Sequence, residues 1–149
     1  MSTKTTQSAR KEDVQRKWYV FDATDMVVGR AASQIAAILR GKNKAIFTPH
    51  TDAGDFVIII NADKARFTGR KMEDKNYVRF SGYPGGLTAT PAGELMKKNP
   101  DRMWRRTVWG MLPKNRLSRQ LITKLKVYAG PNHPHEAQRP EVLDLSHKG

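Results

Sequence analysis

The segment DFVIIINA, residues 55–62, constrains the fold most strongly. It contains five consecutive large apolar residues, most of them β-branched, without the polar alternation of a strand that has one face in water. Such a run is typical of a strand buried on both faces, as in a parallel sheet with a covering layer on each side. The segment therefore predicts a central strand in an α/β domain.

The residues before this strand predict a strand followed by a helix. WYVFDA, residues 18–23, is a short β-prone run. In residues 24–41 the apolar side chains recur at helical spacing, with Thr24 or Asp25 available as the N-cap and Gly41 as the C-terminal stop. This alternation indicates a three-layer α/β architecture with a core formed by residues 18–63.

The second half of the chain predicts more helix than strand. Residues 76–86 form a β-prone segment that runs into a loop rich in Gly and Pro, and helices are expected from Pro91, from Asp101 and after Pro113. A last short strand is expected at residues 126–130, followed by a Pro-rich irregular segment.

We therefore expect a single three-layer α/β/α domain over residues 18–145. Residues 1–17 have no hydrophobic period and predict a flexible basic tail, and residues 146–149 form a C-terminal end. The tail also lacks the apolar run of a signal peptide, and the longest apolar run of the chain is too short to span a bilayer. The absence of cysteine suits a reducing cytoplasm and excludes disulfides and Cys-based zinc sites.

The distribution of charge points to a polyanionic partner. The chain has 27 Lys and Arg against 14 Asp and Glu, a formal net charge of +13. Residues 64–126 hold sixteen of these basic residues against four acidic ones, and so account for twelve of the thirteen excess charges. So local an excess predicts a one-sided surface for a polyanion, most commonly nucleic acid, with an anionic membrane surface as the second candidate.

Residues 101–126 contain two amphipathic patterns, separated at Pro113. Each has an apolar stripe on one side and basic residues on the other; the stripes are Trp104, Val108, Met111 and Leu112, and Leu117, Leu121 and Leu125. A helix on a membrane surface has the same pattern. The break at Pro113 and the presence of an α/β core for the stripes to dock on favour nucleic acid, whose phosphates suit the forked guanidinium of Arg.

The candidate RNA-binding residues fall into groups. The first comprises Arg105, Arg106, Lys114, Asn115, Arg116 and Arg119, with Trp109 expected at or beside the interface. The second comprises Lys64, Arg66, Arg70, Lys71, Arg79 and Tyr83, and we add Lys124 and Lys126. Tyr83 lies in SGYPGGL, which predicts either an aromatic platform for a base or ribose, or only a tight turn after a strand. Nothing in the chain resembles a helix-turn-helix or a zinc finger, so we expect no DNA partner.

Enzymatic alternatives are weakly supported. The strand–helix unit at residues 18–41 has the topology of a nucleotide-binding unit, but Gly29 is its only glycine before the helix ends and the phosphate-binding glycine pattern is absent. His50 near Asp52 and Asp55 lacks a nucleophile or third ligand at a recognisable spacing, and the His133–His135 pair is insufficient for a metal site. We expect no catalytic residues, no metal, no cofactor and no small-molecule substrate.

Several motifs, in order, carry a resemblance to a known family. They are WYVFDA, VVGRAAS, TPHTDAGDFVIIINA, SGYPGGL and GMLPKNRLSRQLITKLKVYAG. Over residues 18–145 the chain resembles the L13 family of bacterial large-subunit ribosomal proteins. The resemblance implies a three-layer α/β fold with a mixed, mostly parallel four-stranded sheet. It also implies a structural, non-catalytic role in the cytoplasmic ribosome, with direct binding to large-subunit rRNA, neighbouring ribosomal proteins as partners, and a part in early assembly.

The sequence departs from the family pattern at three positions. Trp109 stands where the family usually has Lys or Arg, Ser118 where it usually has Gly, and Thr88 where a basic residue usually follows the glycine loop. The departures at positions 88 and 109 therefore count against phosphate ion pairs there, and stacking is the alternative for Trp109.

Overall fold

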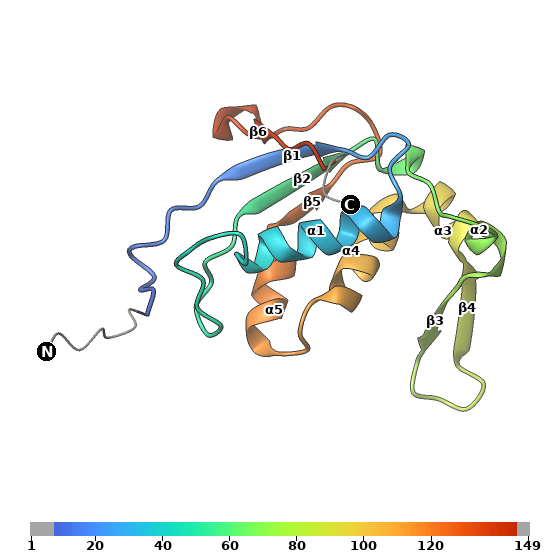
Figure 1. Ribbon diagram of the computed structural model, residues 1–149. Coiled ribbons are helices and arrows are strands. Elements are labelled where there is room, and N and C mark those ends of the chain that lie inside the picture. The colour runs from blue at the N-terminus through green and yellow to red at the C-terminus, as the bar shows by residue number, and fades with distance from the viewer. Residues whose placement is uncertain (1–7, 146–149) are drawn as a thin grey trace, which may run out of the picture.

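The computed structural model describes residues 8–145, which fold around a four-stranded sheet with the order β5-β2-β1-β6 (Figure 1). Its strands are β1 (Trp18–Asp22), β2 (Phe56–Ile60), β5 (Leu125–Val127) and β6 (Glu141–Val142). Each neighbouring pair of strands is parallel. β2 lies inside the sheet, and its three middle residues have no solvent exposure, as the unalternated apolar run predicts.

Two long helices, α1 (Val28–Arg40) and α4 (Pro100–Met111), pack against each other and cover one face of the sheet (Figure 1). The core on this side joins Val57 and Ile59 of β2 to Ile35 of α1 and Trp104 of α4. The Trp104 Nε1–H donates to the carbonyl oxygen of Ala62 at 3.1 Å, so the largest buried side chain also has its polar atom satisfied.

The other face of the sheet is covered by the chain that follows β5. Trp18 stacks on Phe56 with ring centroids 4.3 Å apart, and the His135 ring lies 5.2 Å from that of Trp18. His135 Nε2 and the Tyr128 hydroxyl are 2.8 Å apart, within hydrogen-bond distance. This segment contains the short 3₁₀ turn η3 (Glu136–Gln138) before β6 returns to the sheet edge. Burial lowers the pKa of the His135 imidazole, and the charge of Lys126 acts in the same direction.

The remaining elements are a hairpin at one end of the molecule and several short helical segments (Figure 1). The antiparallel pair β3 (Asn76–Phe80) and β4 (Leu87–Pro91) forms a hairpin that projects from the body (Figure 1). The shorter helical elements are η1 (Ala62–Lys64), α2 (Lys71–Asp74), α3 (Ala92–Lys98), α5 (Arg116–Leu121) and η2 (Ile122–Lys124). The predicted α/β class with a mostly parallel four-stranded sheet is confirmed. The mixed pairing that the resemblance implies is not found within that sheet, because its three strand pairs are all parallel; antiparallel pairing among the described residues is confined to this hairpin.

The first helix begins later than the capping residues suggest. Asp25 has a positive φ of 58°, and the Asp22 carboxylate accepts hydrogen bonds from the backbone N–H and hydroxyl of Thr24. These bonds lower the pKa of Asp22, the Thr24 hydroxyl contributing most. Residues 23–27 therefore form a turn, and α1 starts at Val28 without a side-chain cap.

Residues 8–17, predicted as part of a flexible tail, lie along the loop between α1 and β2. The Ala9 N–H donates to the Thr48 hydroxyl at 3.1 Å, and the Lys17 N–H donates to Asp55 Oδ1 at 2.8 Å. Lys44 reaches the same carboxylate at 2.6 Å and the Gln15 carbonyl at 2.7 Å. Asp55 thus anchors this segment from a fully buried position; residues 1–7 of the predicted tail lie outside the described residues.

Gly54, beside Asp55, tests how tightly this loop is packed. A Cβ at Gly54 would overlap the backbone carbonyl of Leu39, which cannot move without disturbing the end of α1. We expect Gly54→Ala to lower the free energy of unfolding by about 3 kcal/mol or more, measured by urea denaturation. Gly29 is the matched control, because its Cβ would meet nothing within 4 Å. Gly29→Ala is expected to leave stability unchanged or to raise it by up to about 1 kcal/mol; equal losses in both variants would contradict this account.

Candidate nucleic-acid interface

Five arginines from three elements line one shallow, open groove. Arg102, Arg105 and Arg106 come from α4, Arg79 from β3 and Arg119 from α5, with Trp109 on the groove wall. We call these six residues the arginine groove; its volume is about 570 Å³. It continues past Arg79 and Arg106 along the polar side of the hairpin, where Thr88 and Thr90 line a second hollow.

The groove exists because α4 is amphipathic. Arg102, Arg105, Arg106 and Trp109 are spaced at i, i+3, i+4 and i+7 and so share one side of the helix. The opposite side carries Met103, Trp104 and Val108, none of which has any solvent exposure. Burial of the apolar side therefore sets the rotation of the helix and turns its arginines outward.

The arginines outnumber the acids beside them. Asp101 is the carboxylate that lines the groove, and it lies 2.6 Å from Arg105 Nε. Among the described residues, Arg79, Arg102 and Arg119 have no ion-pair partner. The groove therefore presents three guanidinium groups free to fork onto an anion such as a phosphate.

Arg106 also has a positioning role. Its guanidinium donates to the Val78 carbonyl and lies over the Tyr77 ring, 5.6 Å from its centroid. The Tyr77 and Thr107 hydroxyl oxygens are 3.0 Å apart, within hydrogen-bond distance. These contacts hold the base of the hairpin against α4, which keeps Arg79 at the groove.

Trp109 and Lys114 form a unit at the end of α4. The Lys114 ammonium lies over the Trp109 ring, 4.5 Å from its centroid, and donates to the Trp109 carbonyl. Trp109 is half-buried and packs against the core. At the position where the resemblance implies a cation, this chain therefore has an aromatic ring, and the cation above it comes from the loop between α4 and α5.

Asn115 caps the helix that carries Arg116 and Arg119. Its side-chain Oδ1 accepts a hydrogen bond from the Ser118 N–H at 2.8 Å, which starts α5 at Arg116. Arg116 and Arg119 are both exposed, whereas Ser118 is buried. Asn115 thus positions the basic residues, and its amide oxygen is already occupied.

Lys124 requires a correction. The side chain is buried, not at the surface, and its ammonium contacts the Asp52 carboxylate and the carbonyl of Leu39 at 3.4 Å. Burial lowers the pKa of Lys124, while its bond to Asp52 acts in the opposite direction. Arg16 also lies 3.5 Å from Asp52, so this lysine belongs to an internal charge cluster that ties η2 to the loop before β2.

The other predicted residues lie apart from the groove. Arg66 pairs through its backbone with Met26 and Val28, which places this segment beside the start of α1. Lys71 lines a separate cleft there, of about 670 Å³, together with Arg30 and Lys75, which sequence reasoning missed. Lys64, Arg66 and Arg70 are exposed, Lys126 is half-buried in β5, and Tyr83 is 75% exposed on the hairpin loop.

At two further residues, the structure differs from the sequence-based prediction. Arg102 lines the groove, although it is not among the predicted RNA-binding residues. Its spacing could have indicated this position, because it lies one helical turn before Arg105 and Arg106. Met111, assigned to the docking stripe, is 43% exposed because α4 ends at this residue, and it lines the cleft beside α1.

The enzymatic candidates have structural roles instead. Asp52 and Asp55 each pair with a lysine, and His50 lies 3.4 Å from the Ser8 hydroxyl. In residues 8–145 no three His, Asp or Glu side chains gather in a way that could hold a metal ion. Among the same residues, no helix has the length and apolar character needed to cross a membrane.

A comparison of Lys124 with Arg119 separates the effect of burying a cation on stability from the effect of its charge alone. Lys124→Met removes the cation from Asp52, whose side chain is only 16% exposed, so we expect the free energy of unfolding to fall by about 2–4 kcal/mol. Arg119→Met removes the same charge from an exposed position, and its effect should stay within about 0.5 kcal/mol. Both values are measured by urea denaturation; a larger loss for Arg119→Met than for Lys124→Met would reverse these assignments.

Comparison with known proteins identifies the family. The family described as Ribosomal protein L13 matches residues 16–134. Large ribosomal subunit protein uL13 of Pelobacter propionicus is 59% identical over 140 residues, which cover 94% of this chain and 99% of that protein. The protein of the same name from Brevibacillus brevis is 60% identical over 142 residues, covering 95% of this chain and 98% of that protein. The chain therefore belongs to the ribosomal protein L13 family.

Proposed function

We propose that this chain is a structural, non-enzymatic constituent of the large ribosomal subunit, in the cytoplasm, and that it binds large-subunit rRNA directly through the arginine groove. The observation that carries the proposal is the groove itself, in which five arginines face a single carboxylate. The names of its relatives, which are large-subunit proteins at 59% and 60% identity, support the ribosomal setting.

Phosphate neutralisation is the main interaction in this proposal. RNA carries closely spaced phosphates, and each guanidinium that replaces a condensed counterion adds affinity that depends on salt. Arg79, Arg102 and Arg119 provide this contact without first breaking an internal ion pair among the described residues. Because the arginines are held on three packed elements, they also recognise the shape of a phosphate array rather than charge alone.

We assign the remaining candidate residues to RNA contacts according to their position relative to the groove. Lys114 and Arg116 extend the basic surface beyond Arg119, and Trp109 offers part of its ring to a base or ribose. A second contact region consists of exposed or partly exposed residues away from the groove: Lys64, Arg66, Arg70, Lys71, Tyr83 and Lys126. Lys124 is not included, and Asn115 acts as a positioning residue.

A role in early subunit assembly fits this arrangement. The α/β body has its own core, and every residue that lines the groove comes from this chain. Such a protein binds RNA before other proteins arrive. Its cations neutralise phosphates from separate RNA segments, so that these phosphates can lie close together despite their mutual repulsion.

Salt dependence measures the number of phosphate contacts. If the protein contacts about six phosphates, log K for a large-subunit rRNA fragment should fall with log salt with a slope of about −4 to −5. Arg102→Ala combined with Arg119→Ala should make that slope shallower by about 1.4 to 1.8. The thermal unfolding midpoint should barely change, because neither side chain has an ion-pair partner among the described residues.

The matched control removes two positive charges elsewhere. Lys11 and Lys42 are exposed, in the N-terminal segment and after α1, and neither of them lines the arginine groove. Lys11→Ala with Lys42→Ala should change the slope much less. A slope that is the same for both double variants would refute the arginine groove as the main RNA contact, and affinity equal for unrelated RNA would refute specific rRNA binding.

A further inference from the structure

The β3–β4 hairpin has two chemically different faces. Residues opposite each other in an antiparallel pair, and residues two apart in one strand, point to the same side. The pairs Tyr77–Thr90 and Arg79–Thr88 therefore form one face, and the pairs Val78–Ala89 and Phe80–Leu87 form the other. Tyr77 is buried against α4 and lines the same hollow as Arg79, so the first face is the one that borders the arginine groove.

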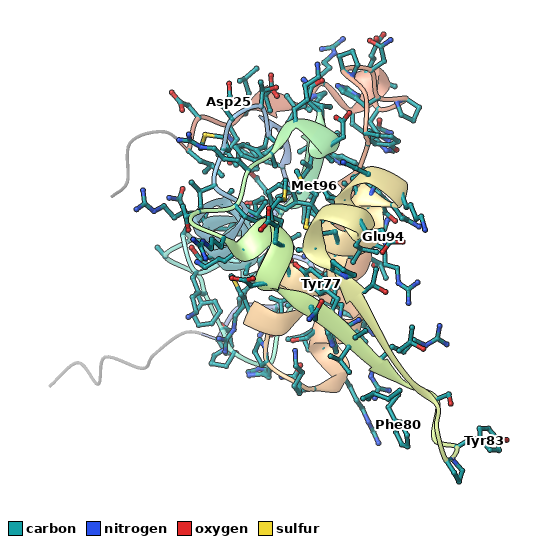
Figure 2. The ribbon with its side chains drawn as sticks, turned by 90° about the vertical axis from the view of Figure 1, so that its right-hand side faces the viewer. Asp25, Tyr77, Phe80, Tyr83, Glu94 and Met96 are labelled. Carbon is teal, nitrogen blue, oxygen red and sulfur yellow. The ribbon has the colours of Figure 1, made fainter. Side chains whose placement is uncertain are left out.

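The second face is apolar and uncovered. Val78 is 43% exposed, Phe80 64% and Leu87 65%. Together with Ala89, these residues form what we call the apolar hairpin face. Figure 2 shows the hairpin extending away from the body of the molecule, with Tyr77 at its base and Phe80 and Tyr83 toward its far end. Folding of this chain therefore leaves the face in water.

This concentration of apolar surface is unusual within the molecule. Eight large hydrophobic residues are exposed among the described residues, and four of them, Val78, Phe80, Tyr83 and Leu87, lie on the hairpin or its loop. Contiguous exposed apolar surface of this kind typically marks an interface with another molecule. An isolated two-stranded ribbon also gains stability when one face packs on a partner.

The charge of the hairpin indicates the kind of partner. Residues 76–91 contain one charged side chain, Arg79, in a protein with a net charge of +13. Arg79 lies on the groove face, so the apolar hairpin face has no cation for a phosphate and no acid to repel one. A surface built for RNA combines aromatic rings with nearby cations, whereas an uncharged centre with an aromatic anchor is typical of a protein–protein interface.

We propose that the apolar hairpin face is a docking surface for an apolar patch on a neighbouring protein of the ribosomal subunit, while the opposite face of the same hairpin borders RNA. Phe80 and Leu87, which pair directly across the strands, are the anchors of this interface. This inference rests on the proposed function, because that function places the partner in the subunit.

Site-specific photo-crosslinking in assembled subunits tests the inference. p-Benzoylphenylalanine is introduced in place of Phe80 in one full-length variant and in place of Arg119 in another, each expressed in cells that lack the unmodified chain. After irradiation of purified large subunits, position 80 should crosslink to a protein and position 119 to rRNA. Crosslinks from position 80 mainly to rRNA would overturn the inference in favour of an RNA wedge. No crosslink from position 80, while position 119 reacts, would overturn it by showing the face uncovered.

The two proposals fail separately in this design. Absence of rRNA crosslinks from position 119 counts against the arginine groove, whatever position 80 does. Phe80→Ser combined with Leu87→Ser provides a second measurement: the amount of the crosslinked protein in subunits should fall by at least half, with the salt slope of rRNA binding unchanged. Thr88→Ser with Thr90→Ser, on the opposite face, is the matched control and should leave that amount unchanged. Unchanged amounts in both double variants would contradict Phe80 and Leu87 as anchors.

Discussion

Burial of Trp104 links the core of this protein to its charged surface. The indole has no solvent exposure, meets Phe21 edge-on at 6.5 Å between ring centroids, and donates its N–H to the carbonyl of Ala62 in η1, just after β2. These contacts fix both the position of α4 on the sheet and its rotation about its own axis. Since three arginines lie on the opposite side of this helix, the packing of one tryptophan sets where the groove opens.

The cations of the protein serve two separate purposes. On the N-terminal side, lysines and Arg16 neutralise carboxylates within the fold: Lys44 pairs with the buried Asp55, and Lys124 and Arg16 pair with Asp52. Around the groove the acids are nearly absent, and the cations remain available to an external anion. Within a chain of net charge +13, the groove therefore carries a local excess of five arginines over one carboxylate, and a local excess of this kind attracts a polyanion.

The sequence predicts those helices and strands whose own residues show a clear hydrophobic pattern. The apolar run of β2, the helical spacing of α1 and the arginine side of α4 are all local patterns, and the structure confirms them. β6 has only two residues, and β4 has the sequence LTATP, with Leu87 as its only large apolar residue; both form because a partner strand is already in place. Their own residues contain no pattern from which these two strands could be predicted.

Lys124 shows the same limit for the candidate site. In sequence it is one more cation in a basic helix, and its burial depends on Asp52, which lies 72 residues earlier in the chain. Met111 continues the spacing of Trp104 and Val108, yet it is exposed because the helix ends there. Sequence spacing places a residue on a side of a helix, but the length of the helix and the identity of its neighbours decide whether that side is covered at a given residue.

The hairpin extends this separation of roles to a single pair of strands. Side chains alternate between the two faces of a strand. A two-stranded ribbon can therefore have polar side chains on one face and apolar side chains on the other. In this protein one side continues the surface of the arginine groove, and the other carries Phe80 and Leu87 without any charge. A loop could present the same residues, but their sides would not be fixed by hydrogen bonding. The strand register is therefore what allows one thin projection to separate a surface suited to phosphates from a surface suited to apolar contacts.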